Sequence, residues 1–166
     1  MKRGLTFIFL TAVVAFGCVS NDGPGQGPAT QLDMRHFQTR SYATTDVRMA
    51  MKAMLNVLQD LGFMVNSADA DLGLITAEKW ANIEHTKKAV KRAQKDEVPL
   101  AASVVLECTA NVSVHGDQCR VRVTFQKKLL GTNGAVMEAR VVDDAAFYQE
   151  FFGKVDKSIF LQREGI

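Results

Sequence analysis

Residues 99–125 contain two consecutive runs in which apolar and polar side chains alternate, and this period of two predicts a long β-hairpin. A two-residue loop at Gly116-Asp117 fits the turn between the runs. It pairs residue 114 with 119, 112 with 121, 110 with 123 and 108 with 125, and every residue in these pairs is apolar. Because a shift of one residue would turn the whole apolar face toward water, the pattern predicts the register as well as the hairpin.

The same register separates the two cysteines of the hairpin. Cys108 lies six residues from the level of Cys119, which corresponds to about 20 Å along a strand. A disulfide requires Cα atoms within about 7 Å of each other. Export from the cytoplasm would favour a bridge, but the strand geometry argues against it. We therefore expect both thiols to stay free and to pack in the core as small hydrophobic groups.

Two segments have apolar residues at spacings of three and four, which is typical of amphipathic helices. The first, at about 46–61, follows the capping residues Thr44-Thr45-Asp46 and ends at Gly62. The second, at about 144–160, follows Asp143-Asp144. Its broad apolar face consists of Phe147, Tyr148, Phe151, Phe152, Val155 and Ile159. An aromatic face of this kind more often packs against a sheet, and the alternative is the wall of a ligand pocket.

Shorter alternating runs and turn signals predict the remaining strands. These strands are 36–43, 63–65, 72–79, 122–130 and 135–142. Asn133-Gly134 marks the last hairpin, where a four-residue loop would place Lys127 opposite Glu138. The order of elements predicts an α+β fold with two layers, in which the two helices cover one face of an antiparallel sheet.

The first residues have the three parts of an export signal. Met1-Lys2-Arg3 is basic, Leu5–Phe16 is apolar and uncharged, and Ala15-Phe16-Gly17 offers small residues to a signal peptidase. We expect residues 1–17 to be a signal peptide, with a short membrane anchor or a buried helix as the alternative. Cys18 follows directly, and a cysteine at this place resembles the lipobox of bacterial lipoproteins, in which the thiol carries a lipid. Cleavage by ordinary signal peptidase would instead give a soluble periplasmic or secreted protein.

Residues 18–33 are expected to be the lipidated cysteine and a flexible tether, because the stretch is rich in Gly and Pro and has little apolar surface to bury. A single domain is then expected over residues 34–166. Val19 follows the cysteine. In enterobacterial lipoproteins an Asp at that place favours the inner membrane, so the resemblance implies an outer-membrane lipoprotein that faces the periplasm.

Charge argues against nucleic acid as a partner. The chain has 20 basic and 18 acidic residues, so that removal of Lys2 and Arg3 with the signal leaves no net charge, whereas nucleic-acid binding needs an excess of cations. Basic residues nevertheless gather in the polar segment 80–97, namely Lys87, Lys88, Lys91, Arg92 and Lys95. We expect a solvated helix face there; the alternative is contact with anionic lipid headgroups, acidic glycans or an acidic partner.

Several segments resemble a family of small Gram-negative envelope lipoproteins. They are Thr39-Arg40-Ser41-Tyr42, Leu58-Gln59-Asp60-Leu61-Gly62-Phe63, Asp71-Leu72-Gly73-Leu74-Ile75, Val123-Thr124-Phe125-Gln126 and Tyr148-Gln149-Glu150-Phe151-Phe152 with Phe160-Leu161. The resemblance implies an envelope location and a fold, and it carries no activity and no catalytic residue to this chain.

A search for catalytic and metal-binding patterns finds little. His36, His85 and His115 lack the spacing of a zinc site. The chain also lacks the nucleophile elbow, the phosphate loop and the C-x-x-C motif. We therefore expect no enzyme, no cofactor and no metal. The function expected is that of a lipid-anchored periplasmic accessory protein, which acts through protein–protein contacts in an envelope assembly or transport complex. The alternative is a periplasmic carrier of a lipid or another small hydrophobic ligand, with its pocket between the sheet and the aromatic helix.

Overall fold

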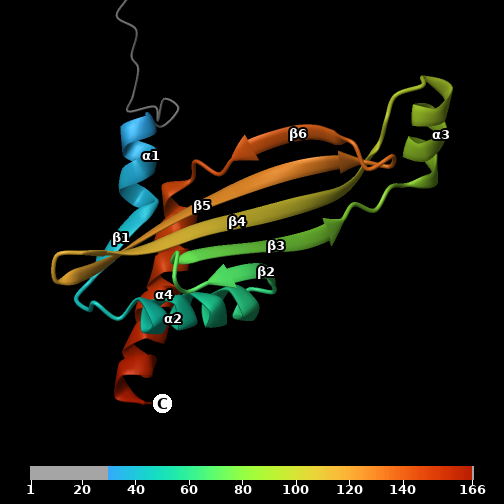
Figure 1. The fold of residues 1–166 in the computed structure, drawn as a ribbon. Helices are drawn as coiled ribbons and strands as arrows, with labels where there is room; N and C mark the ends of the chain where they lie inside the picture. The colour runs from blue at the N-terminus through green and yellow to red at the C-terminus, as the bar shows by residue number, and fades with distance from the viewer. Residues whose placement is uncertain (1–29, 166) are drawn as a thin grey trace, which may run out of the picture.

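A computed structural model describes residues 30–165 of this chain (Figure 1). Its elements follow one another as α1 (Gln31–Phe37), β1 (Thr39–Tyr42), α2 (Val47–Asp60), β2 (Met64–Asp69), β3 (Leu74–Asn82), α3 (Lys87–Lys95), β4 (Ala101–His115), β5 (Gln118–Gly131), β6 (Val136–Val141) and α4 (Ala145–Glu164). The predicted α+β class is confirmed. No helix in the described part of the chain is both long and apolar enough to cross a bilayer.

The sheet is antiparallel throughout and has the strand order β1-β5-β4-β3-β2, with β6 also paired to β5. β1 and β6 therefore share one edge of β5. β1 pairs with residues 119–122 and β6 with residues 126–130. Between them, the amide of Val123 donates to the carbonyl of Gln38 at 2.9 Å. The amide of Phe125 donates to the Tyr148 hydroxyl at 3.1 Å.

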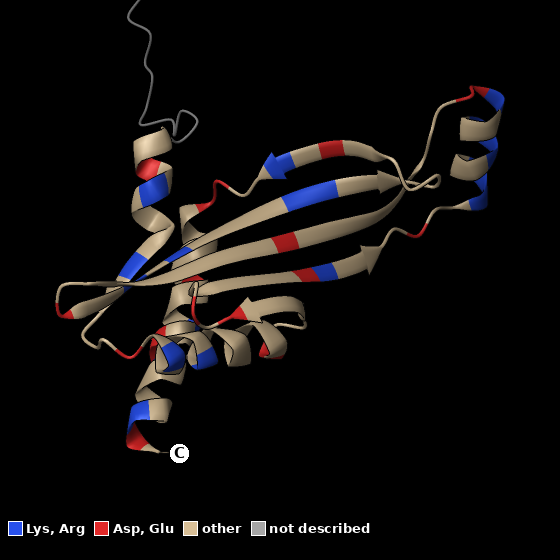
Figure 2. Cartoon of the chain, viewed as in Figure 1, with Lys and Arg blue, Asp and Glu red and all other residues tan. Residues whose placement is uncertain are grey.

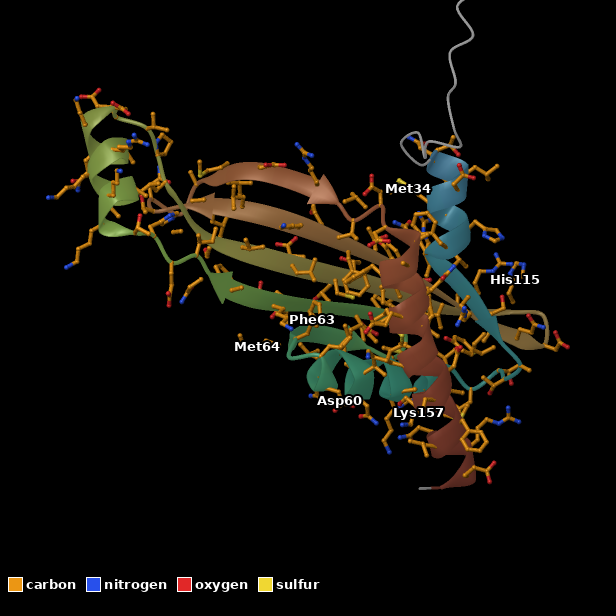
Figure 3. The ribbon with its side chains drawn as sticks, turned by 180° about the vertical axis from the view of Figure 1, so that it is seen from behind. Met34, Asp60, Phe63, Met64, His115 and Lys157 are labelled. Atoms are coloured by element: carbon orange, nitrogen blue, oxygen red, sulfur yellow. The ribbon has the colours of Figure 1, made fainter. Side chains whose placement is uncertain are left out.

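Helices α2 and α4 lie together on one face of the sheet, as the view from behind shows (Figure 3). The core between the layers takes alternate residues of the three central strands, which are Ile75, Ala77, Cys108, Ala110, Val112, Cys119, Val121, Val123 and Phe125. Phe125 is fully buried, and the ring centroids of Phe147 and Phe151 lie 4.9 and 5.0 Å from its own. The aromatic face of α4 thus packs against the sheet.

The predicted register of the β4–β5 hairpin is confirmed at all four pairs, from 114 with 119 to 108 with 125. Both helix predictions are also confirmed. Asp46 caps α2 by accepting a hydrogen bond from the amide of Met49 at 2.9 Å. Asp144 caps α4 in the same way. Gly62 has the positive φ of 79° that follows the end of α2. Local capping and one apolar face were enough to predict these helices, because they agree with the tertiary packing.

Three expectations at the residue level are wrong. The strand predicted at 36–43 is shorter, because α1 occupies the residues up to Phe37. Residues 31–33, predicted to belong to a flexible tether, are helical, and the first turn of α1 is held by reciprocal hydrogen bonds between Thr30 and Asp33; the rest of the predicted tether lies outside the described residues. Lys127 lies opposite Arg140, whereas Glu138 pairs with Leu129. The loop is one residue shorter than expected, since the amide of Gly131 donates to the carbonyl of Ala135, and a β-bulge between Leu129 and Leu130 shifts the register by one residue more. Turn residues alone do not predict a bulge.

Candidate interaction surfaces

The sheet extends well past the two helices that cover it (Figure 1). We call this extension the distal sheet and define it as residues 78–82 of β3, 101–107 of β4, 126–131 of β5 and 136–141 of β6. The strands pair across its whole width. Each inner strand of the distal sheet has a paired strand on both sides, so its backbone hydrogen bonds are made without α2 or α4. The distal sheet is therefore regular structure that leaves both faces without a helix layer.

One face of the distal sheet carries a cross-strand row of Trp80, Val105 and Lys128. Trp80 is 51% exposed, although Val105 beside it is buried. Lys128 is held by an ion pair with Glu107, in which the nitrogen and oxygen are 2.7 Å apart. The pair keeps the lysine ammonium beside a carboxylate while its methylene groups lie on the sheet. The indole ring is left as an exposed aromatic surface beside a fixed ion pair.

The opposite face of the distal sheet continues the face that α2 and α4 cover elsewhere. Leu106 and Leu129 lie on it and both are only partly buried, with Leu106 at the margin of the core. The outer strand β6 is exposed along its whole length. Val136, which pairs with Leu130 and so lies on the face of Trp80, is 56% exposed, and Met137, at the bulge, is 43% exposed. Apolar surface is thus available on both faces of one sheet, and surface of this kind marks interaction sites when it is contiguous.

Helix α3 lies at the far end of the distal sheet, on two connecting segments (Figure 1). Thr86 caps it by accepting a hydrogen bond from the amide of Ala89 at 3.3 Å. All five basic residues predicted for this segment, Lys87, Lys88, Lys91, Arg92 and Lys95, lie on α3 and are exposed. None of them forms an ion pair with any residue in the described range 30–165. The segment forms a helix without any buried residue, so its basic face is open to solvent.

The two segments that connect α3 to the sheet are held against each other. The amide of Ile83 donates to the carbonyl of Ala102 at 2.8 Å, so that β3 and β4 are joined up to the point where they leave the sheet. His85 contacts the carbonyl of Ala101 through its ring nitrogen. The amide of Thr132 donates to the carbonyl of Leu100 at 3.1 Å. Hydrogen bonds therefore join the two segments that flank α3 to each other and to the residue that follows β5.

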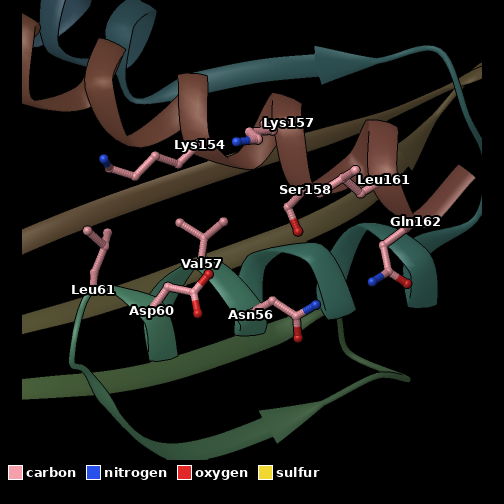
Figure 4. Close-up of a pocket in the computed structure, with 9 residues that line it drawn as sticks. All are labelled: Asn56, Val57, Asp60, Leu61, Lys154, Lys157, Ser158, Leu161 and Gln162. Atoms are coloured by element: carbon pink, nitrogen blue, oxygen red, sulfur yellow. The ribbon is translucent and has the colours of Figure 1, made fainter. Parts of the chain in front are cut away.

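A pocket of about 470 Å³ lies between α2 and α4 (Figure 4). Its apolar lining comes from Val57, Leu61 and Leu161, and the polar lining includes Asp60 and Lys157. Ser158 also lines the pocket, and no histidine or other base lies at hydrogen-bond distance from it among the described residues. The pocket offers a small mixed surface and no arrangement that supports catalysis.

The space under the aromatic helix, where a carrier would hold its ligand, is occupied by side chains. The ring centroids of Phe63 and Tyr148 lie 5.8 and 5.7 Å from that of Phe125. Phe151 and Phe152 are themselves 5.6 Å apart. Rings at these separations contact one another directly. The aromatic residues therefore fill the layer between α4 and the sheet as core.

The histidines and cysteines do not come together. His36 is on α1, where a strand edge was expected, His85 precedes α3 and His115 ends β4. The described residues contain no group of three or more side chains suited to a metal ion. Cys108 and Cys119 are both buried and free, as predicted. Burial raises the pKa of the Cys108 thiol to about 12, so this thiol is unreactive in the folded protein. Cys18 lies outside the described residues.

Comparison with known proteins adds little to this geometry. No family model matches the chain, and no curated protein matches it. Among solved structures, it is similar to the crystal structure of a DUF4468 family protein from Bacteroides ovatus, with 12% identity over 73% of this chain and 84% of that one, and a TM-score of 0.37. A likeness of this size assigns neither a family nor a function.

The distal sheet is the surface that sequence reasoning missed. Trp80 and Ala81 were placed in the polar segment, because charged residues dominate from Glu84 onward. The alternation in β3 runs from Ile75 to Glu78 and breaks there, because Lys79 lies on the face of Ala77 and Trp80 on the face of Glu78. The pattern therefore did not indicate that the strand continues to Asn82, which only its pairing with β4 shows.

Proposed function

We propose that this protein is a lipid-anchored periplasmic accessory protein of the cell envelope that binds a protein partner through the distal sheet. The observation that carries the proposal is the exposure of Trp80, Val136 and Met137 on regular strands that no helix covers. Paired strands hold these side chains in fixed positions, so that a partner meets a preorganised surface and little conformational entropy is lost on binding. Tryptophan in particular is enriched among residues that dominate binding energy at interfaces.

Envelope location rests on the amino-terminal sequence. The basic start, the apolar run and Cys18 support export and lipid attachment, and the absence of a disulfide between the two buried thiols is compatible with that compartment because the thiols lie beyond the reach of oxidants. An acyl anchor restricts the domain to a thin layer at the membrane, and this raises its effective concentration toward a partner in the same layer.

Site-specific photocrosslinking in intact cells tests the proposed partner contact. A photoreactive phenylalanine derivative placed at position 80 or 137 should give a discrete crosslinked protein band. The same derivative at position 160 is the matched control, because Phe160 is 59% exposed but lies on α4, away from the distal sheet. Equal crosslinking at all three positions, or none at 80 and 137, would contradict the proposal.

Crosslinking to lipid alone at these positions would also contradict the proposal; a carrier for a hydrophobic ligand would instead hold its ligand between the sheet and α4. That alternative has less support, because the aromatic residues under α4 pack on Phe125 and on one another. Lipid attachment is tested separately by metabolic labelling with a palmitate analogue. The wild-type chain should be labelled and Cys18→Ser should not; an unlabelled wild type would identify a soluble protein.

A further inference from the structure

The basic residues of α3 form one continuous face. At 100° per residue the five cations occupy an arc of about 140° of the helix circumference. The partly buried residues Ala89, Val90 and Ala93 lie on the other side. The colouring by charge shows basic residues along α3 and acidic residues only in the segments beside it (Figure 2). α3 is thus a short amphipathic helix on which every charged residue is a cation and Gln94 is the one other polar residue.

This face is available to bind anions, because its cations form no ion pairs with acidic groups among the described residues. Each of the five side chains is exposed and none is paired with a carboxylate among the described residues. A shallow hollow of about 400 Å³ is lined by these five residues alone. The whole chain has a formal net charge of only +2. The five cations of α3 therefore form a local concentration of positive charge at one extremity of a chain that is close to neutral.

We propose that α3 binds the surface of an anionic phospholipid bilayer. A bilayer fits better than nucleic acid, since the cations occupy one short helix and the rest of the chain is close to neutral. The apolar side of α3 carries only small residues that face the molecule, so the contact is electrostatic and involves no insertion into the acyl region. Each lysine or arginine held near an anionic leaflet contributes about 1 kcal/mol to this kind of binding, and salt weakens it.

Helix α3 lies beyond the ends of the strands, at the end of the sheet away from α1 (Figure 1). Its cationic residues are exposed, so a membrane surface can reach them without displacing another element. The inference rests on the proposed envelope location for its cellular setting, whereas the binding itself depends only on the α3 side chains.

Vesicle flotation tests the inference on the chain from residue 18 onward carrying Cys18→Ser, so that neither an acyl group nor the apolar run Leu5–Phe16 can hold the protein on a membrane. The protein should float with vesicles made of phosphatidylglycerol and phosphatidylcholine in equal parts and not with phosphatidylcholine alone. Replacing Lys87, Lys88 and Lys91 with Gln should lower the partition coefficient roughly fivefold for each residue, about a hundredfold in all. The triple variant with Arg at these positions should bind as the parent chain does.

The matched control replaces three exposed lysines elsewhere, Lys52, Lys127 and Lys157, with Gln and removes the same total charge. This control should keep most of the binding. Equal losses in the two Gln triples would show attraction by net charge only, and no preference for anionic vesicles, or binding that salt does not weaken, would overturn the inference. Circular dichroism and thermal unfolding confirm that the variants fold. Crosslinking at position 80 in cells can succeed or fail independently of these results.

Discussion

The hydroxyl of Tyr148 completes the hydrogen bonding of β5 where neither β1 nor β6 reaches it. It accepts from the amide of Phe125 at 3.1 Å, and the side-chain amide of Gln38 donates to it at the same distance. Both Tyr148 and Gln38 are buried, so water cannot replace the hydroxyl. A single side chain on α4 thereby connects α1, the sheet and the helix layer.

Tyr148→Phe should lower the free energy of unfolding by about 1–3 kcal/mol, because it leaves buried donors without a partner. Urea denaturation followed by circular dichroism measures the loss. Tyr42→Phe is the matched control, since the Tyr42 hydroxyl is buried and has no hydrogen-bond partner among the described residues. Its removal should leave stability unchanged or slightly raised. A larger loss for Tyr42→Phe than for Tyr148→Phe would refute this account.

Gly73 allows β3 and β4 to approach closely at the end of their ladder. Its φ is +66°, and a Cβ there would lie 1.9 Å from the carbonyl oxygen of Val112. The amide of Val112 donates to the Gly73 carbonyl at 2.7 Å. Gly73→Ala should destabilise the protein by at least about 2 kcal/mol, from backbone strain and the weakened hydrogen bond.

Gly153→Ala provides the comparison for that substitution. Gly153 lies inside α4, and no atom is within 4 Å of the position of its Cβ. Alanine there should stabilise the protein by about 0.5–1 kcal/mol, because it lowers the entropy of the unfolded chain. Thermal unfolding of the two variants should move in opposite directions, and a shift in the same direction would contradict the close approach at Gly73.

At the scale of elements, the β4–β5 hairpin determines the state of the thiols. Cys108 pairs with Phe125 and Cys119 with Val114, so the two cysteines lie far apart along the hairpin. An aromatic disulfide reagent should leave both thiols unmodified in the folded protein at pH 8. After unfolding without reductant, both should react. A count of no reactive thiols at these two positions in the unfolded chain would show a disulfide and would contradict the observed register.

The Cys108 thiol also makes stability depend on pH. Burial raises its pKa from 9.0 to about 12. A group whose pKa is raised by folding stabilises the protein below the unfolded value, and this contribution is lost as the pH rises toward the folded value. The free energy of unfolding should therefore fall between pH 9 and 12, and the fall should be smaller in Cys108→Ala. Denaturant titrations of both proteins across this range measure the difference; identical slopes would exclude the thiol as a cause.

The whole molecule has a packed end and an open end. The packed end contains α2, α4 and the buried parts of the strands. The open end consists of the distal sheet and α3, and α3 has no buried residue. Because few buried contacts hold α3, the tip should act as a separate unit that can change without loss of the core.

Replacement of residues 84–98 by a short Gly-containing turn should leave the thermal midpoint nearly unchanged. The Ile83–Ala102 hydrogen bond already holds the two ends in position for a turn. Anionic vesicle binding should be lost with the segment, whereas crosslinking at position 80 should persist. Global unfolding of this variant would show that α3 contributes to the core.

The sequence by itself determined the elements whose local signals agree with their burial. The β4–β5 register followed from four apolar pairs, and α2 and α4 followed from capping residues and one apolar face. Each of these patterns repeats every two, three or four residues, so it can be read along the chain without knowing what packs against it.

Tertiary structure alone decided how far each layer extends. The bulge in β5–β6, the gap closed by Tyr148 and the uncovered distal sheet depend on which strands and helices end beside one another. Periodicity specifies the face that a residue occupies, but it does not specify whether another element reaches that face. Trp80 is exposed and the α3 cations gather at the tip because α2 and α4 do not extend over that end of the sheet (Figure 1). Only the packed chain contains that information.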